Sequence, residues 1–112
     1  VLALLGAIPV FVDIYKATYN INPDLIGNAV KSAKDMGLNP KAIIPVDLFG
    51  LPARYRLIEV EARKHNLFII SDSAQGFGGS IRRRKAGSYG DIAITSFFPA
   101  KPLGCYGDGG RN

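Results

Sequence analysis

Apolar residues along this chain fall into short runs separated by longer stretches of mixed character. Four runs are apolar almost without interruption and are bounded by polar residues, glycine or proline. Such runs are typical of buried strands. They predict strands at Ile8–Val12, Lys41–Val46, Leu67–Ile70 and Asp91–Phe97.

Two of the intervening stretches place apolar residues at helical spacing. Residues Asn22–Gly37 begin with a capping side chain followed by proline, which favours the first helical position, and end at a glycine. Residues Tyr55–Asn66 follow an i, i+3, i+7 pattern. We also expect Val1–Leu5 to form the end of a helix, with Gly6 as its left-handed cap.

Strands that alternate with helices of about this length predict an α/β fold with a mostly parallel sheet. The nearly continuous apolar strands are typical of a sheet covered by helices on both faces. In such sheets ligands bind outside the carboxyl ends of the strands. Asp72 and the turn Ser96–Lys101 each follow a predicted strand, so we expect the chemistry there.

Composition narrows the possible chemistry. The 112 residues include 14 basic and 9 acidic residues, and much of the net charge of +5 lies in the run Arg82–Lys85. One cysteine and one histidine exclude a disulfide framework and nearly exclude zinc chemistry. The longest uncharged apolar stretch, Val1–Val12, is shorter than the roughly 20 residues of a membrane span, and we expect a cytoplasmic protein.

Four residues carry the candidate chemistry: Asp72, Gln75, Ser96 and Lys101. A carboxylate at a strand end can hold a nitrogen cation, and a partly buried lysine between two prolines favours the nucleophilic amine. Ser96 and the neighbouring glycine-rich segments suit a phosphate. Each residue alone has an ordinary structural explanation, as a cap or a solvated side chain. Together they describe a site for pyridoxal phosphate.

The segments KAIIPVDLFGLPA, IISDSAQGFGG and TSFFPAKPLGCYGDGG resemble the DegT/DnrJ/EryC1/StrS family of sugar aminotransferases. The resemblance extends from Leu2 to Gly110. It implies the three-layer α/β large domain of the aspartate aminotransferase class, with pyridoxal phosphate as cofactor. We expect residues 1–112 to be part of that cofactor-binding domain, without its N-terminal segment and the C-terminal small domain.

The resemblance also implies a role for individual residues. Lys101 matches the lysine that bonds covalently to the cofactor, and Asp72 matches the aspartate that pairs with the pyridine nitrogen. Gln75 matches the glutamine near the 3-hydroxyl group, and Ser96 the serine on the phosphate. Ala74 lies where a small residue packs on the cofactor ring.

By the same resemblance, the enzyme transfers an amino group from glutamate to a keto group of a nucleotide-linked sugar in polysaccharide or amino-sugar biosynthesis. The sequence of the last segment is similar to that of members acting on UDP-linked 3-keto sugars, including N-acetylated uronic acids. Lys101 favours the aminotransferase branch over the dehydratases, which carry histidine there. The family is dimeric, and we expect residues 1–112 alone to be inactive.

Two other interpretations stay open. A small basic α/β module could bind nucleic acid or another polyanion through Arg82–Lys85, although such a run is more often a solvated loop. Binding through phosphate contacts would then depend steeply on salt. The chain could also be a non-catalytic remnant that only dimerises. The intact set of four site residues favours the enzyme, with neither nucleic acid nor membrane as partner.

Overall fold

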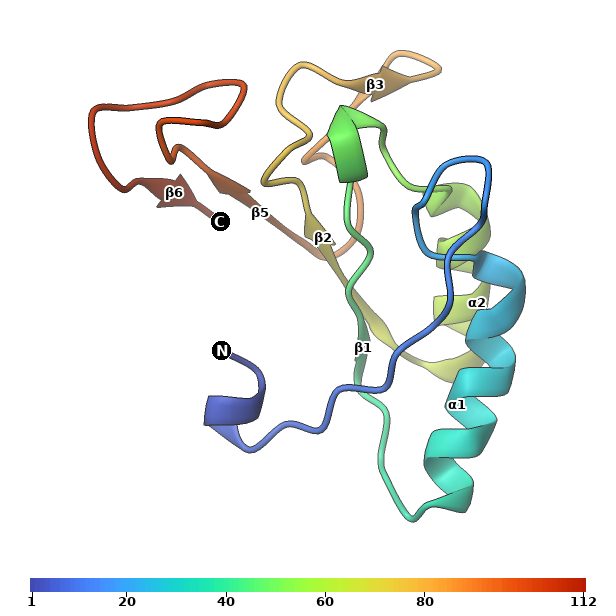
Figure 1. The fold of residues 1–112 in the computed structure, drawn as a ribbon. Coiled ribbons are helices and arrows are strands. Elements are labelled where there is room, and N and C mark those ends of the chain that lie inside the picture. Colours follow the sequence, from blue (N-terminus) through green and yellow to red (C-terminus); the bar gives the residue numbers. More distant parts are fainter.

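The computed structural model describes all residues, 1–112, and its central element is a four-stranded sheet (Figure 1). The strand order is β1-β2-β5-β6. The first three strands are parallel, and β6 pairs antiparallel with β5. The strands are β1 (Ala42–Ile43), β2 (Phe68–Asp72), β5 (Ile92–Ser96) and β6 (Gly110–Arg111). The predicted α/β class with a mostly parallel sheet is confirmed.

Two α-helices form where the apolar spacing predicts them. Helix α1 (Ile26–Asp35) follows the 3₁₀ turn η2 (Pro23–Leu25), and the side chain of Asn22 caps this start by accepting from the Asp24 amide at 3.1 Å. Helix α2 (Tyr55–His65) ends at Asn66, whose φ of 53° gives a left-handed cap. No helix in the structure combines the length and apolar character that crossing a membrane requires.

Both α-helices pack on the same face of the sheet and create the core (Figure 1). The helices and the strands contribute buried aliphatic side chains that meet between the two layers: Ile26, Val30, Ile58 and Ala62 from the helices, Ile43 and Ile69 from the strands. Within this core Tyr55, the first residue of α2, stacks on Tyr89, with ring centroids 4.3 Å apart. Residues 1–112 thus supply one helical layer and the sheet.

The opposite face of the sheet is open to solvent in this chain. Phe68 precedes the buried Ile69 on β2, and Ile92 precedes the half-buried Ala93 on β5; Phe68 and Ile92 are 64% and 51% exposed. Because these side chains are apolar, the face has the composition of an inner sheet surface. The helices that the sequence predicts on both faces are therefore seen on one face within residues 1–112.

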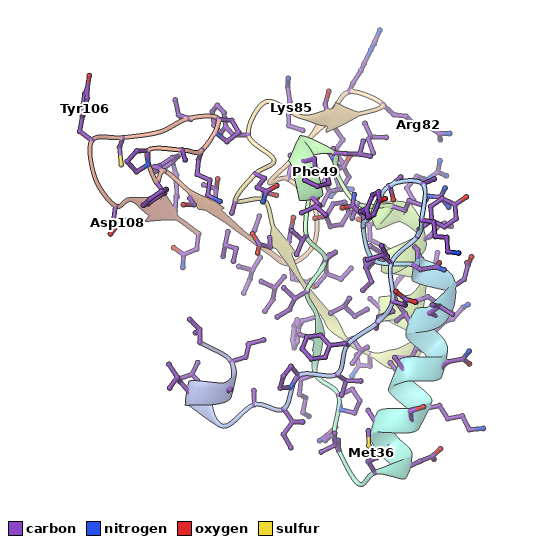
Figure 2. The ribbon with its side chains drawn as sticks, viewed as in Figure 1. Met36, Phe49, Arg82, Lys85, Tyr106 and Asp108 are labelled. Carbon is purple, nitrogen blue, oxygen red and sulfur yellow. The ribbon has the colours of Figure 1, made fainter.

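The basic run is an ordered hairpin rather than a solvated loop. Strands β3 (Ser80–Ile81) and β4 (Arg84–Lys85) pair antiparallel, and Arg82 and Arg83 connect them with φ of 49° and 68°. The guanidinium of Arg84 lies 4.3 Å from the centroid of the Tyr89 ring and 3.2 Å from Glu59. The hairpin is fixed at its base, while Arg82 and Arg83 remain exposed at the tip (Figure 2).

The prediction of a buried strand at Ile8–Val12 is wrong. The segment follows the short 3₁₀ turn η1 (Ala3–Leu5) and its left-handed cap Gly6, as expected, but then runs without ladder pairing. Pro9 has no amide hydrogen to donate, and Phe11 is 91% exposed because no neighbouring strand lies beside it. An apolar run alone cannot supply the pairing partner that a strand needs.

The strand predicted at Lys41–Val46 is real but shorter. Its ladder is confined to Ala42–Ile43, and Val46 then forms an isolated parallel bridge with Asp72. Pro45 interrupts the ladder because it cannot donate, although its carbonyl oxygen accepts from the Asp72 amide at 2.9 Å. The chain continues into the 3₁₀ turn η3 (Leu48–Gly50) at the carboxyl edge of the sheet.

Candidate active site

The carboxyl ends of β2 and β5 bring two predicted site residues to one edge and one face of the sheet. Asp72 is the last residue of β2, and Ser96 is the last residue of β5. The parallel register pairs Asp72 with Ile94, and residues paired in this way share a face. Ser96, two residues beyond Ile94, lies on that face too. This is the face that α1 and α2 leave open.

Asp72 has a fixed backbone and a partly free carboxylate. Its amide donates to the carbonyl oxygen of Pro45 and its carbonyl oxygen accepts from the Asp47 amide, both at 2.9 Å. One carboxylate oxygen, Oδ1, accepts from the Ala74 amide at 3.1 Å. The other, Oδ2, has no hydrogen-bond partner in the chain. The half-buried side chain can therefore accept a hydrogen bond from a ligand.

Gln75 is oriented by a residue from a distant part of the sequence. Its Oε1 accepts from the backbone amide of Phe49, in turn η3, at 2.9 Å. Because Phe49 supplies the hydrogen, the oxygen of the Gln75 amide must face it, and Nε2 is left free to donate. Phe49 itself has a φ of 56° and a largely exposed ring (Figure 2).

Ser96 ends β5, and Lys101 belongs to the turn that follows it. The Ser96 Oγ accepts from the Phe98 amide at 3.2 Å, so its hydroxyl hydrogen is free for another acceptor. The Lys101 amide donates to the Phe98 carbonyl at 2.8 Å, and its half-buried side chain makes no ion pair or hydrogen bond within the chain. The turn is tight at Gly104, where a Cβ atom would lie 2.4 Å from the Pro99 carbonyl oxygen.

The five predicted residues thus fall into two neighbouring segments at the same end of the sheet. Asp72, Ala74 and Gln75 follow β2, and Ser96 and Lys101 end or follow β5. Between them they offer a carboxylate oxygen, an amide donor, a hydroxyl donor and an amine. This is the set of groups that a phosphorylated pyridine aldehyde requires.

Behind Asp72, on the helix side of the sheet, lies a buried polar network that the sequence analysis missed. Asp47 is fully buried, and its Oδ1 accepts from the Tyr55 hydroxyl at 2.8 Å and from the Ala53 amide at 3.0 Å. Its Oδ2 accepts from the Ser73 hydroxyl at 2.7 Å. Ser71 is hydrogen-bonded to the Tyr55 hydroxyl and lies 3.1 Å from the Ser73 Oγ.

Two signals in the sequence point to this network. Asp47 directly follows an apolar run, where a charged residue stands at the end of a buried strand, and Ser71 and Ser73 alternate with Asp72. In the structure burial raises the pKa of the Tyr55 hydroxyl well above its ordinary value; the Ser71 hydrogen bond lowers it, and the bond to Asp47 raises it. Tyr55 therefore stays a neutral donor to the carboxylate.

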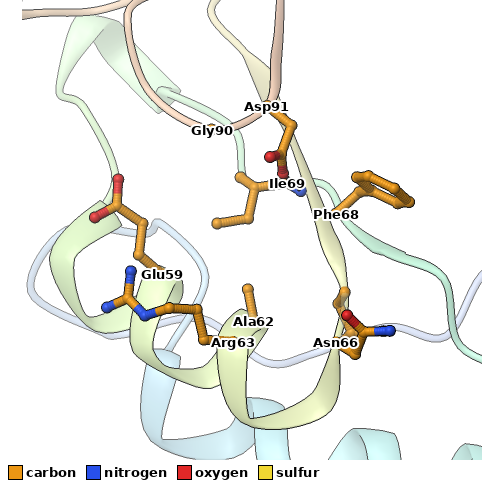
Figure 3. A pocket seen from close by; sticks show the side chains of 9 residues that line it. Glu59, Ala62, Arg63, Asn66, Phe68, Ile69, Gly90 and Asp91 are labelled. Carbon is orange, nitrogen blue, oxygen red and sulfur yellow. Dashed lines mark hydrogen bonds between the residues drawn. The ribbon is translucent and has the colours of Figure 1, made fainter.

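Two pockets of the molecule lie away from the predicted site residues. A pocket of about 410 Å³ opens near the start of β2 and β5, between Arg63, Asn66 and Asp91 (Figure 3). An apolar groove of about 790 Å³ runs between residues 2–14 and the α1 and β1 region. Neither contains a predicted site residue. No cluster of three His, Cys, Asp or Glu side chains suited to a metal ion occurs.

Comparison with known proteins identifies the class. The DegT/DnrJ/EryC1/StrS aminotransferase family matches residues 1–111, so the chain belongs to this family. The UDP-2-acetamido-2-deoxy-3-oxo-D-glucuronate aminotransferase of Pseudomonas aeruginosa is 47% identical over 108 residues, covering 96% of this chain and 28% of that protein. The chain therefore spans little more than a quarter of its relative's length.

Solved structures agree. A DegT DnrJ EryC1 StrS aminotransferase from Brucella abortus superposes with a TM-score of 0.93 at 52% identity, covering 96% of this chain and 29% of that one. NtdA from Bacillus subtilis, solved with bound cofactor PMP, superposes with a TM-score of 0.77 at 34% identity, covering 94% of this chain and 22% of that one. The fold of residues 1–112 is that of the aminotransferase structures.

Proposed function

We propose that the protein carrying this chain is a pyridoxal phosphate-dependent aminotransferase that acts on a nucleotide-linked sugar. Residues 1–112 form the central part of its cofactor-binding large domain. The observation that carries the proposal is the sheet register, which puts Asp72 and Ser96 on one open face, with Lys101 five residues beyond Ser96. Membership of the aminotransferase family supports it.

The groups left free in this chain fit the cofactor. Bound pyridoxal phosphate supplies an aldehyde that takes up an amino group and a ring that withdraws electrons. The unpartnered Oδ2 of Asp72 can accept from a protonated ring nitrogen and keep it charged. Gln75 Nε2 can donate to the ring oxygen, and the Ser96 hydroxyl can donate to the phosphate. Ala74 is small enough to allow close packing on the ring.

Lys101 has two tasks in this proposal. Its amine Nζ would hold the cofactor covalently at the aldehyde carbon. When not bonded in this way, the same Nζ would be able to accept a proton at the reacting carbon and give it back. A histidine at this position could move the proton but could not form the covalent attachment. Lysine therefore favours amino transfer over dehydration.

The substrates follow from the relatives. We propose glutamate as the amino donor and a UDP-linked 3-keto sugar, such as an N-acetylated uronic acid, as the acceptor. The name of the Pseudomonas aeruginosa relative describes such a sugar. The enzyme would act in the cytoplasm, as a homodimer, in polysaccharide or amino-sugar biosynthesis.

The basic hairpin gives no support to the alternative of a nucleic-acid module. Arg84 is already engaged by Glu59 and Tyr89. Of the remaining cations, Arg82 and Arg83 form the two-residue tip and Lys85 lies on β4, and no aromatic side chain is interleaved with them as a stacking platform. A salt titration with duplex and single-stranded DNA would reveal steeply salt-dependent binding if this interpretation were correct.

The test of the proposed function is covalent labelling. A full-length enzyme carrying residues 1–112 is incubated with pyridoxal phosphate, reduced with borohydride and mapped by peptide mass spectrometry. We expect the label on Lys101, and we expect Lys101→Arg to lose both the label and transamination of a UDP-3-keto sugar. A label on another lysine, or none on the wild-type enzyme, would overturn the proposal.

A further inference from the structure

We infer that Asp47 is a positioning residue that orients Asp72 and Gln75 through the buried network and through its own turn. The inference rests on the proposed function, because it assigns Asp47 a task at the cofactor site. It concerns a residue that touches neither cofactor nor substrate and that lies 25 positions before Asp72.

The network holds β2 on both sides of Asp72. Ser71 and Ser73 lie on either side of Asp72 in the sequence, and both side chains turn toward the helices. The Ser73 hydroxyl donates to Asp47 Oδ2, and Ser71 bonds to Tyr55, which donates to Asp47 Oδ1. The residues on both sides of Asp72 are thus tied to one carboxylate.

Asp47 also begins the turn η3, which reaches both Asp72 and Gln75. The Asp47 amide donates to the Asp72 carbonyl at 2.9 Å, and two residues later the Phe49 amide donates to Gln75 Oε1 at the same distance. One short segment therefore fixes the backbone of Asp72 and the side chain of Gln75. Asp72 and Gln75 are the two residues predicted to hydrogen-bond to the ring and its hydroxyl group.

The hydroxyl hydrogens of the network are all used within it. Tyr55, Ser71 and Ser73 each have one hydroxyl hydrogen, and the hydrogens of Tyr55 and Ser73 point to Asp47. Ser71 must then donate within the network, to Tyr55 or to Ser73, because both of those hydroxyls have spent their hydrogens. The carboxylate determines the orientation of the Tyr55 and Ser73 hydroxyls and restricts the Ser71 hydroxyl to these two acceptors. Replacing that acceptor changes the whole arrangement.

A fully buried carboxylate without a cation beside it is a costly way to hold a strand, and apolar side chains would serve stability as well. The polar network in addition fixes the orientation of the backbone around Asp72, because hydrogen bonds fix angles as well as distances. This orientation matters because β2 ends in Asp72, whose carboxylate must meet a ring nitrogen. A purely structural role would not require it.

The experiment compares Asp47→Asn and Ser73→Ala with Ile58→Val in the full-length enzyme. Ile58 is fully buried on α2 and outside the network, so its variant lowers stability without touching the hydrogen bonds. Each protein is measured for pyridoxal phosphate affinity, for the pH midpoint of the bound cofactor's visible absorbance, and for urea unfolding without cofactor.

We expect both network variants to weaken cofactor binding about tenfold and to displace the absorbance midpoint, as loss of an outer hydrogen-bond partner does elsewhere. Ile58→Val should lower the urea midpoint of unfolding by a comparable amount. It should leave the cofactor affinity and the pH midpoint of the absorbance unchanged. The inference is overturned if the network variants behave like Ile58→Val. Should Asp47→Asn not fold, Ser73→Ala, which removes only one hydroxyl group, decides the question.

Failure of the proposed function would look different. In that case the wild-type enzyme would take up no pyridoxal phosphate at Lys101. Hydrogen exchange of the apo protein would still report on the network, since the Ala74 amide is bound to Asp72 Oδ1. Faster exchange at Ala74 in Asp47→Asn than in Ile58→Val would support positioning, and equal exchange would contradict it.

Discussion

The two sides of β2 differ in how completely their polar groups are used. On the helix side, the hydroxyls of Ser71 and Ser73 are buried and hydrogen-bonded, and no buried side-chain nitrogen or oxygen in the structure lacks a partner. On the other side, Asp72 keeps an unpartnered carboxylate oxygen. Because side chains alternate between the two faces of a strand, adjacent residues of β2 carry either hydrogen bonds used within the chain or a free acceptor.

The same division holds for the apolar residues. Ile43 and Ile69 are buried under the helices, while Phe68 and Ile92 face solvent on the other side. Stability within residues 1–112 therefore comes from the helix side. The open side contributes the candidate site residues and an apolar surface. Substitutions can therefore perturb the helix side and the open side separately.

The largest expected effect is on the helix side. Ile58→Ala removes a fully buried side chain and should lower the free energy of unfolding by about 3 kcal/mol, since the cavity remains between α2 and the sheet. Urea unfolding of the full-length enzyme measures this. The folded fraction should keep its kcat. A loss of kcat at full folding would show that the two sides are not separable.

Asp72→Asn tests the open side. The amide keeps the oxygen that accepts from Ala74 but cannot hold a positive charge on a ring nitrogen. We expect transamination to fall about a hundredfold, with stability nearly unchanged. Steady-state kinetics and urea unfolding on the same preparation check both. A large loss of stability would mean that Asp72 belongs to the structural side after all.

Tyr55 makes the free energy of unfolding depend on pH. Its pKa is raised by burial in the folded protein, whereas in the unfolded chain it lies near 10. The unfolded state therefore loses its proton first, and this contribution to stability is complete below about pH 10 and decreases above it, by up to about 1.4 kcal/mol per pH unit. Urea unfolding between pH 8 and 11 should show a steeper decline for the wild type than for Tyr55→Phe. Parallel declines would contradict the assignment.

The smallest expected effect concerns the hairpin. Two arginines with positive φ occupy a two-residue turn that favours Asn-Gly. The double variant Arg82→Asn with Arg83→Gly should raise the free energy of unfolding by about 1 kcal/mol. The matched pair Arg82→Gln with Arg83→Gln removes the same charge but keeps both Cβ atoms. If it stabilises equally, charge rather than backbone conformation is the cause.

The sequence predicted correctly those helices that depend only on residues within one segment. Helix α2 and its end at Asn66 follow from side-chain spacing and a residue that tolerates left-handed φ. The α/β order followed from the same spacing. The strand predicted at Ile8–Val12 failed because pairing depends on a neighbour that the run itself does not contain.

The candidate site shows the same limit. The motif of residues 72–75 was visible because its members are adjacent, and the resemblance added roles for Ser96 and Lys101 that stay predictions. The bonds from Phe49 to Gln75 and from Ser73 to Asp47 each join residues 26 positions apart. No pattern within one segment reveals such a partner, and only the folded chain brings the two together.

The contact between Phe49 and Gln75 has a consequence for how this position can vary. The backbone amide does the holding, and the ring is 79% exposed, so the side chain is not needed for the contact. The aromatic side chain can therefore be replaced by another without loss of the hydrogen bond to the glutamine. Proline is the exception, since it has neither the hydrogen to give nor the backbone angle to fit.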